Sequence, residues 1–217
     1  MKISILTLFP NMFDGFLNES IIKRAIDKKK VEIEIINFRD YSEHNNNQVD
    51  DTPYGGGAGM VLMCQPIFDA INSIRTDDSL VVMLTPEGKK YDQKMAREFS
   101  NIKHLILLCG HYEGFDERIK NIVDIEVSIG DYILTGGEIP AMAISDSIIR
   151  LIDGVISKES LESESFDDEL FDYPVYTKPS NFRGLQVPNV LISGDHEKIR
   201  IWREKERIKK TEKYRKD

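Results

Sequence analysis

The chain has 217 residues, of which 41% are hydrophobic and 30% are charged, and its formal net charge at pH 7 is −8. This composition is typical of a globular protein and argues against a disordered or membrane-embedded chain, and the length predicts no more than two domains. No apolar run approaches the roughly 20 residues that span a bilayer, and the N-terminus lacks a signal-peptide pattern. We therefore expect a cytoplasmic protein with no membrane contact.

Short β-branched runs alternate with segments of helical periodicity through most of the chain. The expected strands are residues 3–8, 31–36, 80–84, 104–108 and 122–125. The expected helices are residues 20–28, 65–74, 92–99 and 139–151. Because strands separated by helices form parallel pairs with helices packed on both faces, this order predicts an α/β fold with a mostly parallel sheet.

Two segments interrupt this alternation. Residues 38–60 include a run of asparagines and a run of glycines, and a loop of that length is usually functional or disordered. Residues 158–173 are strongly acidic and are typical of an interdomain linker. Further on, prolines punctuate an irregular stretch before a final helix that Asp195 can cap. We therefore expect a first domain over 1–157, a linker over 158–175 and a small, mainly helical domain over 176–217.

The two cysteines, Cys64 and Cys109, both lie in apolar surroundings. Their number and spacing predict neither a disulfide framework nor a zinc site. We expect two buried, reduced thiols, which also favours a reducing compartment.

Glycine-rich turns follow several of the expected strands. Thr85-Pro86-Glu87-Gly88 follows one strand directly, and further clusters begin at Gly110 and Gly130, whereas a cluster from Gly55 to Gly59 follows no expected strand. In an open α/β sheet, ligands bind beyond the carboxyl ends of the strands, and glycine lets the backbone approach a nucleoside closely. A single cluster is more often a tight turn, but several clusters after successive strands favour a ligand site. The G-x-G-x-x-G and P-loop signatures are absent, which argues against a Rossmann dinucleotide site and against a P-loop.

Longer strings carry a resemblance that spans nearly the whole chain. They include Thr7-Leu8-Phe9-Pro10, the segment 53–57, the run from Gly110 to Arg118, and the segment 128–141. Shorter matches are Tyr176-Thr177-Lys178-Pro179, Ser193-Gly194 and Trp202-Arg203. On these residues, the chain resembles the bacterial tRNA (guanine-37, N1) methyltransferases of the knotted SPOUT class.

The resemblance implies an obligate homodimer that binds S-adenosylmethionine in a deep trefoil knot, formed by the loops after residues 84, 109 and 128. It also implies a tRNA-binding role for the C-terminal domain and a dependence on Mg²⁺, for which the spacing of the acidic residues assigns no ligands. The implied cofactor-binding residues are Thr85, Pro86, Gly88, Gly110, Tyr112, Glu113, Gly114, Ile129, Gly130, Asp131, Tyr132, Ile133, Leu134, Gly136 and Gly137.

Methylation of guanine N1 needs a base that removes the N1 proton and a cation that holds the charge gathering on O6. The resemblance places the base immediately before Ser165-Phe166, where this chain has Glu164 and the family has aspartate. Asp168 is the alternative if the segment is shifted in register, and without the resemblance both are solvated linker acids. Arg150 corresponds to the family's catalytic arginine, although on position alone it is equally a cation that suits a helix C-terminus.

The end of the chain is basic although the protein is acidic. Residues 198–216 carry ten Lys or Arg against three Glu, which suits a contact with tRNA phosphates or an exposed helix of mixed charge. The leading interpretation is methyl transfer to guanine N1 beside the anticodon of tRNA. Two alternatives stay open: a related knotted methyltransferase that acts on ribosomal RNA or a ribose hydroxyl, and a dimeric RNA-binding protein without turnover. The first alternative gives the linker carboxylate no role.

Overall fold

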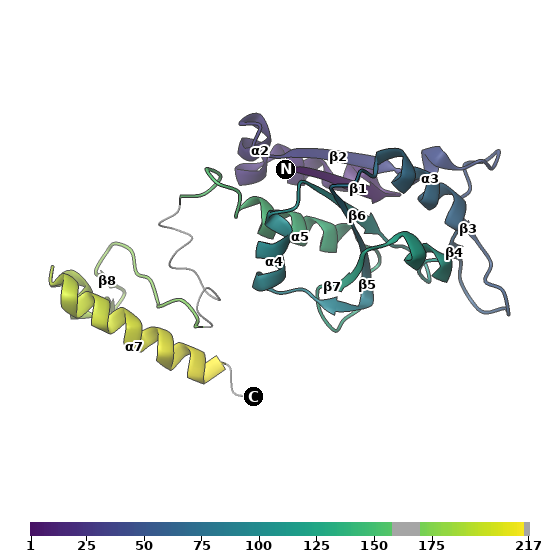
Figure 1. Cartoon of the computed structure of the whole chain (residues 1–217). Coiled ribbons are helices and arrows are strands. Elements are labelled where there is room, and N and C mark those ends of the chain that lie inside the picture. The colour runs from purple at the N-terminus through teal and green to yellow at the C-terminus, as the bar shows by residue number, and fades with distance from the viewer. Residues whose placement is uncertain (158–169, 215–217) are drawn as a thin grey trace. The chain divides into compact units, whose positions relative to one another are not determined.

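The computed structural model describes residues 1–157 and 170–214. Contacts divide the chain into two compact units, Met1–Ile156 and Ser157–Asp217. The first unit is built on a five-stranded sheet in the order β2-β1-β6-β5-β7, and every neighbouring pair in it is parallel (Figure 1). The α/β fold with a mostly parallel sheet is therefore confirmed.

Four of the five strands lie where the sequence places them, and the fifth does not. The strands of the sheet are β1 (Lys2–Thr7), β2 (Glu32–Asn37), β5 (Ser79–Lys90), β6 (His104–Cys109) and β7 (Ile125–Ser128). The expected strand over 122–125 is wrong except for its last residue, because the preceding residues form a 3-10 helix, η3 (Glu117–Ile122). Ile119 of this helix is fully buried, and Ile122 and Val123 pack against the same apolar cluster, so the start of the run anchors the end of a helix instead of extending a strand.

The four helices expected in the first unit are confirmed, within two residues at either end. They are α2 (Ser20–Asp27), α3 (Cys64–Ile74), α4 (Gln93–Ser100) and α5 (Glu138–Ile149). Asp92 caps α4, since its carboxylate accepts a hydrogen bond of 2.8 Å from the backbone N–H of Met95. Two short elements that the pattern did not predict, η1 (Pro10–Phe13) and α1 (Asp14–Asn18), follow β1.

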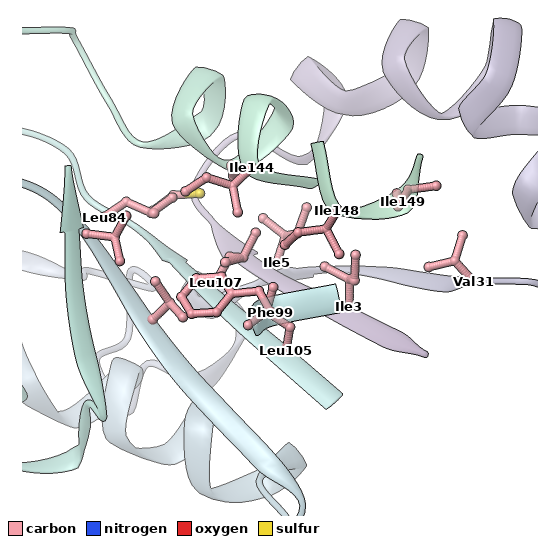
Figure 2. Close-up of a cluster of buried hydrophobic side chains, with 14 of the residues drawn as sticks. Ile3, Ile5, Val31, Leu84, Phe99, Leu105, Leu107, Ile144, Ile148 and Ile149 are labelled. Atoms are coloured by element: carbon pink, nitrogen blue, oxygen red, sulfur yellow. The ribbon is translucent and has the colours of Figure 1, made fainter. Parts of the chain in front are cut away.

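The core lies on both faces of the sheet because successive side chains of a strand point to opposite faces. Leu105 and Leu107 of β6 pack with α4 and α5 on one face, and Figure 2 shows this cluster around Phe99 and Ile144. Ile106 of β6, with its neighbour Leu108, packs on the other face against α3 and η3. All four β6 side chains are fully buried, so the expectation of helices on both faces is confirmed.

The segment 38–60 is more ordered than one long loop. It contains η2 (Phe38–Tyr41) and β3 (Asp50–Asp51), which pairs antiparallel with β4 (Val61–Leu62). The side chains of Phe38 and Val49 are fully buried in the core of the α3 face. These two apolar anchors hold the segment, and the glycine run between β3 and β4 is the exposed end of the hairpin.

The cysteines differ from each other. Cys109, at the end of β6, is buried and Cys64, at the start of α3, is only half-buried, and both are free thiols. Burial raises the pKa of Cys64 to about 11, with a further contribution from its hydrogen bond to Asp116. The two cysteines are not bonded to each other, and the expected full burial holds only for Cys109.

The second unit combines a short hairpin with one long helix. The hairpin is β8 (Asn181–Phe182) with β9 (Leu185–Gln186), followed by η4 (Asn189–Ile192) and α7 (His196–Tyr214). Asp195 caps α7 as expected, accepting a hydrogen bond of 3.1 Å from the backbone N–H of Lys198. In 1–157 and 170–214, every helix is too short or too polar to span a bilayer.

Candidate ligand site at the carboxyl edge of the sheet

The carboxyl ends of the parallel strands meet at one edge of the sheet, and a cavity of about 490 Å³ lies there. Three loops form its walls: 85–88 within β5, 110–114 after β6, and 129–137 after β7. The volume lies within the range of roughly 300–1,000 Å³ that is typical of sites for small molecules and cofactors. The cavity also stands where open α/β sheets bind their ligands.

The cavity brings together the residues that the resemblance assigns to cofactor binding, with two exceptions. Gly88 does not line it, because its Cα faces the backbone of Val127. Asp131 does not line it either, because its carboxylate forms an ion pair of 2.8 Å with Lys90 at the surface. The lining residues that the sequence did not single out are Leu84, Glu87, His111, Phe115, Val127, Ser128, Thr135 and Pro140.

The first loop is an interruption within strand β5. The register with β7 shifts between Leu84 and Lys89, so residues 85–88 bulge out of the sheet. A side chain at Gly88 would overlap the backbone of Val127, which explains why glycine stands at this close approach. The bulge places the backbone of Thr85 and Pro86 in the cavity wall.

The second loop, 110–114, has a strained backbone that is held from outside. Tyr112 has a φ of 58° and Gly114 a φ of 116°, a region that favours glycine. Strand β4 and the residue before it hold the loop through hydrogen bonds from Glu113 N to Met60 O (3.0 Å) and from Leu62 N to Gly114 O (2.9 Å). The base of the glycine-rich hairpin therefore fixes the shape of this cavity wall.

An ion pair locks the chain just beyond that loop. The Arg118 guanidinium donates two hydrogen bonds to Asp116, of 2.8 and 2.7 Å, and the Arg118 backbone N–H donates a third of 3.0 Å. Hydrogen bonding from Arg118 holds the pKa of Asp116 well below its usual range. The fixed carboxylate begins η3 and keeps the exit of the loop in place.

The third loop packs directly on the second. The backbone N–H of Gly137 donates a hydrogen bond of 2.9 Å to the carbonyl of Gly110. A Cβ on Gly137 would lie 2.6 Å from the Cα of Cys109, closer than real side chains come. At the other end of the loop, the ring of Tyr132 covers Gly130, whose φ is 155°. Two loops about twenty residues apart in the chain thus form one continuous backbone wall.

A buried carboxylate lies behind that wall. Glu138, the first residue of α5, has only 3% of its surface exposed, and its Oε1 accepts a hydrogen bond of 2.7 Å from Thr7 Oγ1. His111 is close by, and its Nδ1 is buried without a hydrogen-bond partner in the described part of the chain. Sequence reasoning missed Glu138, since an acid at the start of a helix is ordinary dipole compensation.

Comparison with known proteins identifies the family. The family model described as tRNA (Guanine-1)-methyltransferase TrmD matches residues 1–217. The chain belongs to the TrmD family. A protein of Malacoplasma penetrans named tRNA (guanine-N(1)-)-methyltransferase is 63% identical over 217 residues, covering 100% of this chain and 96% of that protein. Proteins of the same name from Carboxydothermus hydrogenoformans and Ureaplasma urealyticum are each 56% identical, covering 97% and 100% of this chain and 84% and 96% of those proteins.

Of the residues expected to take part in catalysis in this TrmD-family chain, only Arg150 lies within the described part of the structure. Arg150 is the C-terminal cap of α5, half-buried, and its backbone N–H donates to the carbonyl of Asp146 at 3.2 Å. Glu164 and its alternative Asp168 lie outside the described residues. The described residues hold no group of three or more His, Cys, Asp or Glu side chains that could bind a metal ion.

The second unit of this TrmD-family chain has a surface of aromatic and basic side chains. The guanidinium of Arg203 lies 4.6 Å from the ring centroid of Tyr173, and Tyr176 and Trp202 pack 6.4 Å apart. A cavity of about 480 Å³ is bordered by Tyr173, Tyr176, Lys178 and Arg203. Such side chains suit the stacked bases and phosphates of a nucleic acid.

Proposed function

We propose that this chain transfers a methyl group from S-adenosylmethionine to N1 of guanine-37 in tRNA, next to the anticodon. The observation that carries the proposal is the cavity of about 490 Å³ whose walls are the three loops 85–88, 110–114 and 129–137. Membership of the TrmD family and the names of the similar proteins support the reaction and its RNA substrate. A tRNA substrate supports a cytoplasmic activity.

The cavity fits S-adenosylmethionine in size and in chemistry. Apolar side chains such as Leu84, Ile129 and Leu134 suit the adenine ring, and exposed backbone groups of the loops suit its polar edge and the ribose. A Cβ at Gly114 would point into open space, so the backbone there is free to contact a ligand. Glu113, in the same wall, offers a carboxylate to the cofactor's ammonium group.

S-adenosylmethionine, when bound, supplies a methyl group that is already activated as a sulfonium. The protein then needs no covalent intermediate, and its own groups supply alignment and acid–base help. Glu164 removes the proton from guanine N1, with Asp168 as the alternative base, and Arg150 holds the charge that gathers on O6. The described residues hold no group of three or more His, Cys, Asp or Glu side chains that could bind a metal ion, so none of them is assigned to Mg²⁺.

A knot and a homodimer complete the proposal. Strand β5 lies between β6 and β7, so the chain must cross β5 on its way from β6 to β7, and loop 129–137 packs against residues 109 and 110. Both features support a trefoil knot made by the loops after residues 84, 109 and 128. Apolar side chains exposed around the cavity, including Tyr132, Ile133 and Ile139, support burial against a second copy of the chain.

The test is labelled methyl transfer from S-adenosylmethionine to two tRNA transcripts, one with guanosine and one with adenosine at position 37, followed by identification of the modified nucleoside. We expect N1-methylguanosine from the first transcript and no product from the second. Transfer to neither transcript, or to another atom, contradicts the proposal. Light scattering over a range of concentrations tests the dimer, which a stable monomer contradicts.

A further inference from the structure

The carboxylate of Glu138 is buried behind the cavity wall and takes no part in the proposed proton transfer. It does not line the cavity, and its surface is 3% exposed. A Cβ on Gly136 would overlap Glu138 Oε2 and lie 3.3 Å from the carbonyl oxygen of Gly110. Both glycines line the cavity, so only the backbone of one loop separates the carboxylate from a bound ligand.

A hydrogen bond from Thr7 holds the carboxylate of Glu138 in place. Thr7 Oγ1 already accepts a hydrogen bond of 2.9 Å from the backbone N–H of Phe9, which leaves its own proton for Glu138 Oε1 at 2.7 Å. The carboxylate also occupies the first turn of α5, where the helix dipole stabilises a negative charge. Burial and, after it, the charge of Glu138 raise the pKa of the neighbouring Cys109 thiol.

No cation within the described residues neutralises this carboxylate. None of the lysine and arginine ion pairs in 1–157 and 170–214 includes Glu138. The nearby Nδ1 of His111 has no hydrogen-bond partner there, so this atom does not donate to Glu138. The enclosure has a low dielectric, so the negative charge acts strongly on whatever occupies the cavity.

We propose that Glu138 makes the cavity prefer the positively charged methyl donor over its neutral demethylated product. This inference rests on the proposed function, because it takes the ligand to be S-adenosylmethionine. The sulfonium of the donor is cationic and the thioether of S-adenosylhomocysteine is neutral, so a fixed negative charge behind the wall attracts only the first. Product release is favoured for the same reason, and Glu138 acts as a specificity-determining residue without touching the ligand.

The test is to measure by calorimetry the binding of three ligands to the full chain without RNA. The ligands are S-adenosylmethionine, S-adenosylhomocysteine, and sinefungin, in which a carbon that carries an amine replaces the methylated sulfur. Glu138→Gln keeps the shape of the side chain and removes its charge. We expect it to lower affinity for the two cationic ligands relative to S-adenosylhomocysteine by about tenfold. The effect persists at raised ionic strength because the charge is buried.

Two further variants separate charge from packing, and one variant serves as a control. Thr7→Val removes the hydrogen bond and Glu138→Asp shortens the side chain, and both keep the charge, so both keep the preference for cationic ligands even if all affinities fall. Glu126→Gln is the matched control, because Glu126 is already paired with Lys120 at 3.5 Å. We expect its ligand preference to equal that of the wild type.

An equal loss of all three ligands in Glu138→Gln overturns the inference and leaves Glu138 a purely structural role. If Glu138→Gln fails to fold, the inference is tested by Glu138→Asp and Thr7→Val, and a lost cation preference in both overturns it. Failure of the proposed function is distinguishable, since the wild type itself then binds neither S-adenosylmethionine nor S-adenosylhomocysteine.

Discussion

The two compact units differ in what stabilises them. In the first, strands such as β6 bury every side chain on both faces of the sheet. In the second, no residue within 170–214 is buried, and α7 carries exposed pairs such as Arg200 with Glu197 and Lys198 with Asp195. Exposed pairs of this kind contribute little to stability. The first unit therefore holds a preformed cavity, and the second offers charge and aromatic rings to a partner.

The largest expected effect is a loss of turnover without a loss of cofactor binding. Glu164→Gln should lower kcat by about 10²–10⁴-fold, because the base that removes the N1 proton is lost. Affinity for S-adenosylmethionine should be unchanged, since the cavity belongs to the first unit. Single-turnover methyl transfer and calorimetry measure the two quantities, with Asp168→Asn as the comparison, which loses turnover in place of Glu164→Gln if Asp168 is the base. Full turnover in Glu164→Gln contradicts the assignment of the base.

Stability should respond very differently to truncation of an apolar side chain in the two units. Leu107→Ala, at a fully buried position of β6, should cost about 2–5 kcal/mol. Ile199→Ala, at a half-buried position of α7, should cost less than half as much. Urea denaturation of each variant measures the difference. Equal losses would mean that the second unit has a core comparable to that of the first.

The close contact between the second and third loops should be sensitive to a single methyl group. Gly137→Ala places a Cβ against the backbone of Cys109 and should weaken S-adenosylmethionine binding by at least about tenfold. Gly15→Ala is the matched control, because its Cβ meets nothing within 4 Å and alanine suits a helix. Unchanged binding in Gly137→Ala would show that this contact does not shape the cofactor site.

A smaller effect is expected from the basic helix of the second unit. Replacing the exposed Lys205 and Lys209 together by Gln should raise KM for tRNA about threefold to tenfold and reduce its dependence on log[salt] by about two. Lys94→Gln, an exposed position on α4, should leave both quantities unchanged. The opposite ranking of the two variants would place the tRNA contact on the first unit.

The smallest effect concerns the pH dependence of folding. Burial, followed by the charge of Lys2, lowers the pKa of His104, whose ring bonds to Ser4 and Ser79 at 2.9 and 2.8 Å. Since the unfolded state binds the proton more readily, this contribution to stability is complete above the unfolded pKa of about 6.5 and is lost as the pH falls below it. Urea midpoints should fall between about pH 7.5 and pH 5.5. His104→Asn should flatten that slope, and an unchanged slope contradicts it.

How far the sequence predicts the molecule depends on whether a feature leaves a local pattern. Runs rich in apolar residues at 3–8 and 104–108 located β1 and β6, because both faces of the sheet are buried. The run at 122–125 was misassigned because a few apolar residues serve a 3-10 helix as well as a strand. The role of Glu138 could not be predicted from the sequence, because its buried carboxylate is bound by Thr7, which is far from it in the chain.

The candidate site was predictable only where a local sequence pattern marks its residues. The glycine clusters mark the three loops, since close backbone approach requires glycine there. The exclusion of Gly88 and Asp131 from the cavity depends on a register shift and on an ion pair with Lys90, neither of which leaves a local pattern. The placing of Glu164 still rests on resemblance alone.

Hydrogen exchange with and without S-adenosylmethionine, in the absence of RNA, tests the division between the two units most directly. We predict slower exchange in residues 110–114 and 129–138 and unchanged exchange in α7. Protection confined to the second unit, or no protection in the loops at a saturating concentration of the ligand, would contradict a preformed cofactor site at the carboxyl edge of the sheet.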